Sequence, residues 1–500
     1  MQLYDKDLLS VQEVRELVAK AKAAQFELSE KSQEEVDRIV KAIAEAGVRN
    51  AARLGAMAHE ETGFGTAEDK TIKNIFASDG VYQYIKDMKT VGELERDEER
   101  RLRIIAVPVG VIAGLIPSTN PTSTAFYKSE ISVKAGNAII FSPHPNARNC
   151  ILEAVKVIRQ AIAEAGGNED LVSCITIPTI QATDNLMKHP DVALILATGG
   201  SAMVRAAYSS GTPAIGVGPG NGPAYIERTA DVPLAVKRIM DSKTFDNGTI
   251  CASEQSIVTE TGIADQVKEE LKKQGGYFLT KEQSDKLSGF LLRANGTMNP
   301  KIVGRTALKI AEMAGITVPA GTKLLVSEQD PMNVNKKNPY SREKLCPVIA
   351  FFTVDGWEAA CELSIRILQN EGAGHTMTLH TKNKDVVREF ALRKPVSRIL
   401  VNTPGALGGV GASTGLAPAL TLGCGAVGGS ATSDNITPMN LINIRRVAWG
   451  LCELEDLRKG SPVPKDEPSC GCGTKTDLSA EDIEAITREI MKRLGAGLGK

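Results

Sequence analysis

Residues 103–116 read Arg-Ile-Ile-Ala-Val-Pro-Val-Gly-Val-Ile-Ala-Gly-Leu-Ile, and this apolar stretch begins the pattern that decides the fold. Helical stretches such as 147–165 and 201–209 alternate with further strand-like runs, which lie at residues 137–142, 171–177, 192–197 and 212–217. Strands that alternate with helices in this way form β-α-β units. We therefore predict a mostly parallel sheet with helices on both faces.

The segments on either side of this region are also predicted to contain regular helices and strands. Before it, the first ninety residues predict helices, with capping boxes at Ser10-Val11-Gln12-Glu13 and Ser32-Gln33-Glu34-Glu35. After it, a second α/β region begins near residue 230, with helical and strand-like runs at 232–242, 255–259, 262–274, 349–352 and 398–401. The sequence thus predicts two doubly wound α/β domains.

A glycine-rich segment and a late strand follow the second region. Residues 405–429 carry too much glycine to hold a helix, so we expect a folded loop near a ligand or a domain junction. Residues 440–447 predict a short strand that could pair with the one near residues 101–107. Two such strands, far apart in the sequence, would suit a sheet formed between subunits.

The C-terminal residues differ in composition from everything before them. Residues 461–476 are rich in Pro and Gly without apolar periodicity, which is typical of a linker. Beyond them Ser479 can cap a helix with one apolar stripe, formed by Ile483, Ile486, Ile490 and Leu494. Because a helix with a single narrow apolar stripe needs a partner, we expect residues 477–495 to dock on another surface.

Composition and charge exclude several classes of protein. The 500 residues include 59 Lys and Arg against 60 Asp and Glu, so no excess of basic residues favours a nucleic-acid partner. No apolar run reaches the roughly 20 residues that cross a bilayer, and the first residues lack a signal peptide's order. Nine scattered cysteines indicate reduced thiols, and five histidines without a Cys-x-x-Cys pair predict no metal site. We expect a soluble, intracellular protein.

A set of short motifs gives a more specific indication. They lie, in order, at residues 108–111, 116–122, 128, 136–138, 142–145, 198–201, 218–223, 247–254, 343–348 and 421–425. Together they resemble the aldehyde dehydrogenase superfamily, and within it the CoA-acylating branch. Any one motif alone is weak, whereas the ordered set spans roughly residues 10–450.

The resemblance implies a domain plan. Residues 1–98 and 108–228 would form an NAD-binding domain, and residues 229–430 a catalytic domain that carries the nucleophilic cysteine. Residues 99–107 and 431–458 would supply a small β element for oligomerisation, in a homodimer or homotetramer. The linker would be 461–476, and residues 477–500 would form an amphipathic targeting helix.

Cys251, in Asn247-Gly248-Thr249-Ile250-Cys251, aligns with the nucleophile of the family. A thiolate adds to an aldehyde carbonyl and leaves an oxyanion that can expel hydride. The resemblance assigns the oxyanion contact to the side chain of Asn120 and to the backbone N–H of Cys251. From composition alone, Cys251 could be a small buried hydrophobic residue and Asn120 the start of an Asn-Pro turn.

The same resemblance assigns cofactor-binding residues, with NAD as the expected cofactor and NADP not excluded. They are Ser118, Thr119, Ser142, His144, Thr198, Gly199, Gly200, Ser201, Gly218 and Glu343. Residues 198–201 lie between a predicted strand and helix, where free N–H groups favour a pyrophosphate, although they could form an ordinary turn. Glu343 aligns with the glutamate that holds the nicotinamide ribose, and its alternative is a solvated surface charge.

Val217 stands where hydrolytic members of the family carry the glutamate that activates water. That glutamate lies two residues before a Gly-Gly pair, which aligns with Pro219-Gly220. Valine cannot accept a proton, so a thioester on Cys251 would persist until the thiol of coenzyme A attacks it. His375, in a Gly-His loop typical of the acylating branch, could serve as the base for coenzyme A, or could simply bind backbone.

These expectations combine into one reading and two alternatives. The reading is oxidation of acetaldehyde or propanal to acyl-CoA with reduction of NAD, in the bacterial cytoplasm and inside a microcompartment. The tail resembles peptides that direct such enzymes into these shells, so shell or core proteins would be partners. The alternatives are a hydrolytic NAD-dependent dehydrogenase and a non-catalytic scaffold protein of the microcompartment.

Overall fold

The computed structural model describes residues 5–459. At the N-terminus, α1 (Lys6–Ser29), α2 (Gln33–Thr62), α3 (Ala67–Ile75) and α4 (Val81–Ile85) confirm the predicted helices, with one π-helical turn, η1 (Phe76–Gly80), between the last two. The Ser32 capping box opens α2 as predicted. The predicted cap at Ser10 is wrong, because the Asp5 carboxylate accepts from the N–H groups of Asp7 and Leu8 and starts α1 one turn earlier.

The first α/β region contains a five-stranded parallel sheet. Its order is β5 (Val172–Cys174), β4 (Ala138–Pro143), β3 (Val111–Ile116), β6 (Val192–Thr198) and β7 (Ala214–Val217). The intervening helices are α5 (Pro121–Lys134), α6 (Arg148–Glu164), α7 (Ile180–Lys188) and α8 (Ser201–Tyr208). The parallel sheet is therefore as predicted, and its strands follow the predicted runs except in the first run, 103–116.

The stretch 103–116 forms two strands rather than one. The first, β2 (Leu102–Pro108), belongs to a different sheet from β3. The extended run is interrupted at Gly110, whose φ of 122° is one that residues other than glycine rarely adopt. Pro108, at the end of β2, has no N–H to continue a ladder.

The second α/β region contains a seven-stranded parallel sheet. Its order is β10 (Gly276–Phe278), β11 (Leu324–Glu328), β12 (Val348–Val354), β9 (Ser256–Glu260), β8 (Pro223–Ile226), β13 (Gly374–His380) and β14 (Val396–Val401). Its helices are α9 (Val232–Thr244), α10 (Ala264–Lys273), α11 (Lys281–Leu291), α12 (Ala307–Met313), α13 (Gly356–Asn370) and α14 (Lys384–Arg393). Strand β8 pairs with β9 and β13, although the sequence analysis placed residues 223–226 in the first domain.

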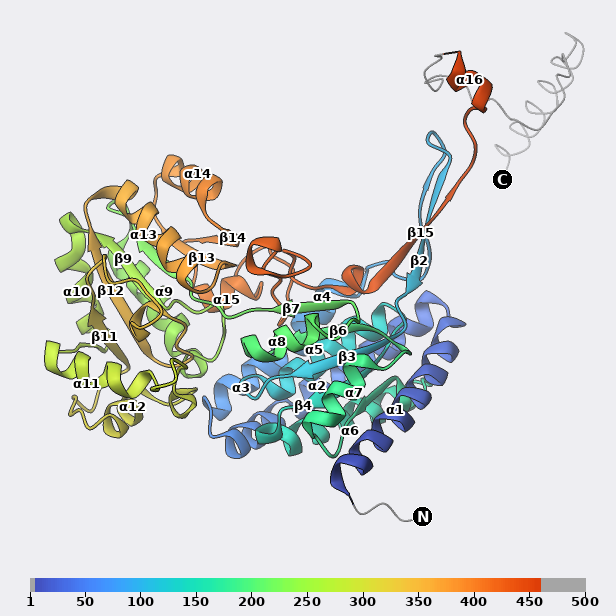
Figure 1. The fold of residues 1–500 in the computed structure, drawn as a ribbon, viewed down its shortest axis with the longest axis horizontal. Helices are drawn as coiled ribbons and strands as arrows, with labels where there is room; N and C mark the ends of the chain where they lie inside the picture. The colour runs from blue at the N-terminus through green and yellow to red at the C-terminus, as the bar shows by residue number, and fades with distance from the viewer. Residues whose placement is uncertain (1–4, 460–500) are drawn as a thin grey trace, which may run out of the picture. The chain divides into compact units, whose positions relative to one another are not determined.

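Helices cover both faces of the seven-stranded sheet (Figure 1). Along β12, Ala350 and Phe352 pack into one hydrophobic core, whereas Ile349 and Phe351 pack into another on the opposite face. Side chains of successive strand residues point to opposite faces, so this alternation follows from strand geometry. The five-stranded sheet shares a third core with the N-terminal helices.

A three-stranded sheet joins β1 (Gly92–Asp97), β2 and β15 (Ile442–Ala448) in that order, which confirms the predicted pairing of the late strand with residues near 101–107. Among the described residues, segments 95–104 and 446–459 form a compact unit separate from the rest. The short helix α16 (Leu454–Arg458) belongs to it. The predicted linker and targeting helix, residues 461–500, lie outside the described residues.

The glycine-rich segment does contain a helix, α15 (Gly405–Gly409), so that expectation is wrong. Two side chains hold its first turn, because Glu254 accepts from the Gly405 N–H at 2.7 Å and Ser242 accepts from the Ala406 N–H at 2.7 Å. Glycine also permits close packing here, since a Cβ on Gly409 would lie 2.6 Å from the Cβ of Ala252. Tertiary contacts therefore outweigh the low helix propensity of glycine.

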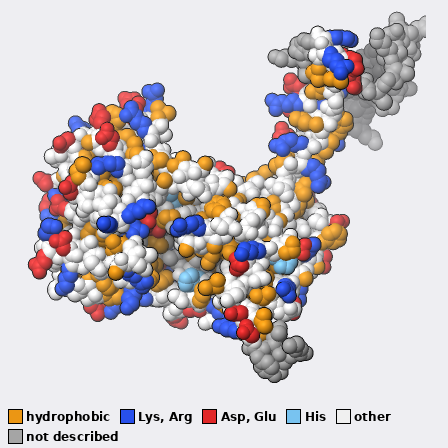
Figure 2. Space-filling model, in the orientation of Figure 1, with side chains coloured by type: hydrophobic (Ala, Val, Ile, Leu, Met, Phe, Trp, Pro, Cys, Tyr) orange, Lys and Arg blue, Asp and Glu red, His pale blue; other side chains and the backbone are white. Residues whose placement is uncertain are grey.

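The surface carries both signs of charge, with acidic and basic side chains interspersed on the face that Figure 2 shows. Among the described residues, no helix is both long enough and apolar enough to cross a membrane.

Candidate active site

Cys251 lies in the turn between the 3-10 segment η4 (Phe245–Gly248) and strand β9. Its side chain is partly buried, between the buried residues Ile250 and Ala252. Burial, and after it the nearby Glu343 carboxyl, raise the pKa of the Cys251 thiol to about 12. At neutral pH this thiol is protonated, so reaction as a nucleophile requires a group that removes the proton.

A glycine loop covers the backbone of Cys251. A Cβ on Gly220 would lie 1.9 Å from the Cys251 carbonyl oxygen, so no side chain fits at this position. The N–H of Gly220 donates to Glu343 Oε1 at 2.8 Å. Burial raises the pKa of Glu343 to about 8, although the Gly220 N–H opposes this effect. Glu343 is therefore a partly buried carboxyl bound to the loop that covers Cys251, rather than a solvated surface charge.

His375, near the start of β13, also lies close to Gly220. Its Cε1 would be 3.4 Å from a Cβ at Gly220. The ring is buried, with Nδ1 3.0 Å from Thr376 Oγ1, while Nε2 has no hydrogen-bond partner among the described residues. Burial, and next the Arg398 charge, lower the pKa of His375 to about 3. The imidazole is neutral and has a ring nitrogen free to exchange a proton.

Arg398 holds this part of the site together. Its guanidinium donates to the carbonyl oxygens of His375 at 3.1 Å and Gly423 at 2.6 Å, and to Asn435 Oδ1 at 2.6 Å. The side chain is 4% exposed. It therefore joins strand β13 to the glycine-rich segment around the cysteine.

Asn120 lies at the N-terminus of α5, directly before Pro121, as an Asn-Pro turn would require. Its side chain makes no capping bond, however. Instead Oδ1 accepts from Lys73 Nζ at 2.6 Å, and Nδ2 donates to Thr119 Oγ1 at 3.2 Å. The same Lys73 ammonium reaches Asp246 Oδ2 at 2.5 Å and Thr249 Oγ1 at 2.8 Å, two residues that precede Cys251. Asn120 is thus connected to the nucleophile loop.

Several predicted cofactor residues gather at the carboxyl edge of the five-stranded sheet. Ser118, Ser142 and Thr198 fall at or just after the ends of β3, β4 and β6. Strand β3 pairs with both β4 and β6, so the strand order reverses there, where α/β sheets bind dinucleotides. Gly199 and Gly200 precede α8, and an added Cβ on Gly200 would meet no atom within 4 Å. Open space beside a helix N-terminus fits a pyrophosphate.

Three of the predicted cofactor residues, Ser142, His144 and Thr198, have partners within the protein. Ser142 Oγ lies 2.8 Å from Thr183 Oγ1 on α7, and His144 Nδ1 accepts from the Asn146 N–H at 3.1 Å. Thr198 Oγ1 lies 3.2 Å from Thr421 Oγ1. Gly218 begins the loop that leads to Gly220, and Ser201 is the first residue of α8.

The glycine-covered loop of Cys251 in one α/β region, and a sheet edge of the kind that binds dinucleotides in the other, agree with the comparison to family models. Residues 3–415 match the model described as the aldehyde dehydrogenase family. The chain belongs to the aldehyde dehydrogenase family.

Curated relatives indicate which branch of the aldehyde dehydrogenase family this chain resembles. The chain is 45% identical over 444 residues to the bifunctional aldehyde-alcohol dehydrogenase AdhE of Escherichia coli, covering 88% of this chain and 50% of that protein. It therefore spans about half the length of the aldehyde-alcohol dehydrogenases it matches. It is 36% identical to the acetylating succinate-semialdehyde dehydrogenase of Clostridium kluyveri, covering 92% of this chain and 99% of that one.

Solved structures of this family agree along the whole fold. A probable aldehyde dehydrogenase from Listeria monocytogenes is 62% identical with a TM-score of 0.90, over 91% of this chain and 100% of that one. An acetylating aldehyde dehydrogenase from Geobacillus thermoglucosidasius is 52% identical with a TM-score of 0.89, over 90% and 99%. Two propionaldehyde dehydrogenases are more distant, each with a TM-score of 0.79 over 87% of this chain. One, from a bacterial microcompartment of Clostridium phytofermentans, is 27% identical and is covered to 97%. The other, from Rhodopseudomonas palustris with bound propionyl-CoA, is 28% identical and is covered to 94%.

In this chain, Val217 is the last residue of β7 and is 4% exposed. It pairs with Thr198 across the strands, directly before the loop that covers Cys251. The side chain is apolar, so the end of β7 supplies no group that can take a proton from water.

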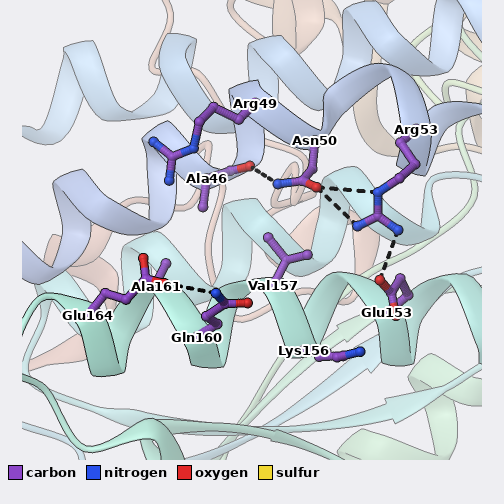
Figure 3. A pocket seen from close by; sticks show the side chains of 10 residues that line it. All are labelled: Ala46, Arg49, Asn50, Arg53, Glu153, Lys156, Val157, Gln160, Ala161 and Glu164. Carbon is purple, nitrogen blue, oxygen red and sulfur yellow. Dashed lines mark hydrogen bonds and ion pairs between the residues drawn. The ribbon is translucent and has the colours of Figure 1, made fainter.

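Two surface pockets contain none of the predicted site residues of this family. One, of 360 Å³, lies between α2 and α6 (Figure 3) and is lined by Ala46, Arg49, Asn50, Arg53, Glu153, Lys156, Val157, Gln160, Ala161 and Glu164. An ion pair of Arg53 with Glu153 at 2.8 Å spans it. The other, of 430 Å³, is lined by Ser397, Arg398, Leu416, Ala417, Ser433, Asp434, Asn435, Thr437, Met439 and Asn440.

The sequence analysis missed Lys73, Asp246 and Arg398. Lys73 and Asp246 are 173 positions apart, and Arg398 binds segments on both sides of it in the chain. In the sequence, no local pattern distinguishes these three buried charged residues from the many charged residues at the surface. Only Asp246 lies next to a recognised motif in the sequence, because it directly precedes residues 247–254.

Proposed function

We propose that the chain is a CoA-acylating aldehyde dehydrogenase, which converts an aldehyde, NAD⁺ and CoA to acyl-CoA, NADH and H⁺. The carrying observation is a nucleophile loop at Cys251 with an apolar, buried Val217 at the position of the hydrolytic base. A thioester formed on Cys251 is then protected from water activation and is available to a thiol. Relatives described as acetylating, and a propionaldehyde dehydrogenase with propionyl-CoA, support the same chemistry.

The first chemical step is addition of the Cys251 sulfur to the aldehyde carbonyl. The thiol proton must leave, because its pKa is raised to about 12. The oxyanion that forms would accept hydrogen bonds from the Asn120 amide and the Cys251 backbone N–H, which stabilise charge only as it develops. This addition gives a thiohemiacetal, and loss of hydride from its carbon to the bound dinucleotide would leave the acyl group on Cys251 as a thioester.

The expected dinucleotide fits the edge described above. Residues 198–201 would hold its pyrophosphate, and Ser118, Thr119, Ser142, His144 and Gly218 would surround its remaining parts. Glu343 would accept hydrogen bonds from the hydroxyl groups of the nicotinamide ribose. When bound, the nicotinamide supplies the hydride acceptor of the reaction.

His375 is the base we assign to the second half of the reaction. Its imidazole has Nε2 unpartnered and would take the proton of the CoA thiol as the sulfur attacks the Cys251 thioester. Because burial lowers the pKa of the ring to about 3, the ring would hold this proton only briefly and pass it to the departing Cys251 sulfur. The sulfur–carbon bond to Cys251 breaks, and the thiol of Cys251 is restored.

The aldehyde, the assembly and the location are part of the same proposal. We expect acetaldehyde or propanal, and a homodimer or homotetramer formed through strands in 99–107 and 431–458. A microcompartment relative supports a bacterial cytoplasmic enzyme inside such a shell. Docking would use residues 477–495, which lie outside the described residues.

One assay tests the proposal: NADH formation with aldehydes of two to four carbons, with CoA present and omitted, followed by identification of the product. We expect NADH and acyl-CoA only when CoA is present. Free acid without CoA would favour the hydrolytic alternative. No NADH under either condition would favour a non-catalytic scaffold.

A further inference from the structure

We infer that Lys73 is a positioning residue that orients the Asn120 carboxamide, so that its N–H group faces the oxyanion formed on Cys251. This rests on the proposed function, because it concerns the same nucleophile. Lys73 lies on α3, a helix that carries none of the predicted site residues. Its side chain is 4% exposed.

The contacts of Lys73 account for all its donors. An ammonium group has three N–H bonds and no acceptor. Lys73 uses them on Asn120 Oδ1 at 2.6 Å, Asp246 Oδ2 at 2.5 Å and Thr249 Oγ1 at 2.8 Å. The ammonium is therefore fixed by three acceptors from two separate segments of the chain.

This arrangement allows only one orientation of the amide. The oxygen and the NH₂ of an asparagine side chain are nearly equal in shape, so hydrogen bonding decides which one faces a given neighbour. A flipped Asn120 would direct its own N–H groups at the donor-only ammonium. Lys73 therefore keeps Oδ1 on its side and Nδ2 on the other.

The position of Asn120 in the fold indicates that this contact has displaced an ordinary one. Asparagine at a helix N-cap usually accepts from the first turn of the helix. Asn120 is the N-cap residue of α5, yet its side chain makes no capping bond. The side chain binds Lys73 instead, which a purely structural cap would not need.

Lys73 also links the amide to the nucleophile loop. Asp246 and Asn247 have φ of 47° and 52°, in the left-handed region that residues other than glycine seldom adopt. Asp246 is held there by Thr66, whose N–H lies 2.9 Å from Oδ1, and by Thr249, whose hydroxyl lies 2.6 Å from Oδ2. Through Lys73, the loop that presents Cys251 and the turn that presents Asn120 share one anchor.

The test is a double-mutant cycle on the acylation of Cys251 by an ester, followed as the burst of released nitrophenolate, with Lys73→Met and Asn120→Ala made singly and together. With p-nitrophenyl acetate, the Cys251 sulfur bonds to the acetyl carbon, and the bond between that carbon and the phenolic oxygen breaks. Nitrophenolate leaves, and the thiol proton passes to solvent. This acylation forms the same oxyanion and needs neither NAD nor CoA, so it is separate from the test of the proposed function.

We expect Lys73→Met to lower the acylation rate about tenfold in the presence of Asn120, a fraction of the loss seen when an oxyanion donor is removed. In the Asn120→Ala background it should lower the rate less than about twofold, since there is no amide left to orient. Equal losses in both backgrounds would overturn the inference and leave Lys73 a structural residue.

Lys70→Met is the matched control. Lys70 also binds Asp246 Oδ2, at 3.1 Å, but its other contact is the Thr119 carbonyl oxygen rather than Asn120. Its effect should be the same factor in both backgrounds. Lys73→Gln, which keeps a polar group in the cluster, provides a second variant if Lys73→Met does not fold, and the same cycle decides the outcome.

Discussion

The carbonyl oxygen of Cys251 lies against Gly220, so closely that a Cβ on Gly220 would be 1.9 Å away. Contacts under 3 Å with backbone require the backbone itself to move. Gly220→Ala should therefore displace the nucleophile loop and lower acyl-CoA formation at least about tenfold, as small misplacements of reacting groups do. NADH formation and thermal denaturation measure this, with Gly415→Ala as the control.

Gly415 lies in the glycine-rich segment, and an added Cβ there would meet no atom within 4 Å. Its substitution should leave the rate within about twofold, since surface changes of this kind have small effects. If the two alanine variants lost activity equally, the close contact at Gly220 would not be the cause.

Cys251→Ala should abolish NADH formation while the protein still binds NAD, because the thiol and the dinucleotide edge are on different elements. The measurement is NADH absorbance together with NAD titration by calorimetry. Retention of more than a few per cent of activity, a rough threshold for loss of a nucleophile, would point to another residue. Cys346, buried and with its pKa raised to about 11, would be examined next.

Val217→Glu should release free acid from aldehyde and NAD without CoA. The new carboxylate would stand at the end of β7, directly before the loop on Cys251, where it can activate water. Val217→Gln, with the same size but no base, should show no such release. A folded glutamate variant without any increase in acid would contradict the alignment at this position, and circular dichroism would establish that it is folded despite the buried charge.

Glu343→Gln should change the pH dependence of stability in a defined direction. The pKa of Glu343 is raised from 4.5 to about 8, so the folded protein retains a proton that the unfolded chain has lost between these values. The wild type therefore loses stability as pH rises from about 4.5 to 8, and the glutamine variant lacks this loss. Thermal denaturation at pH 5 and pH 8.5 should show that the glutamine variant becomes more stable relative to the wild type at the higher pH. The same stability difference at both pH values would contradict this prediction.

Truncation after Pro468 should leave catalytic rates unchanged and abolish association with microcompartment shells. The reason is the sequence pattern of residues 477–495, a capped helix with one apolar stripe behind a Pro- and Gly-rich linker. Replacing Ile486 and Ile490 together by Glu should have the same effect. Co-sedimentation with shells measures both, and persistent association would rule out the docking helix.

The strands and helices near the predicted motifs could be assigned from sequence because their apolar patterns are local. The parallel direction of the strands and the pairing of β15 with β2 followed from such patterns as well. The break between β2 and β3 could not be predicted, because it depends on the φ of Gly110. The early start of α1 was missed because Asp5 competes with Ser10 as a cap.

In the candidate site, Cys251, Glu343 and His375 could be chosen from sequence, and the structure places all three around Gly220. Lys73 could not. Its role depends on contacts with Asn120 and Asp246, which only the folded chain brings together. Helix α15 was missed for the same reason, since Glu254 and Ser242 stabilise its first turn from distant positions.

The small apolar side chain of Val217 has an energetic consequence. A hydrolytic enzyme releases the free energy of aldehyde oxidation as heat when water cleaves the acyl group. Here that free energy would be conserved in the sulfur ester passed to CoA, so the overall reaction would remain close to reversible. Its direction would then follow the ratios of NADH to NAD and of acyl-CoA to CoA around the enzyme, and the same site could reduce an acyl-CoA to an aldehyde.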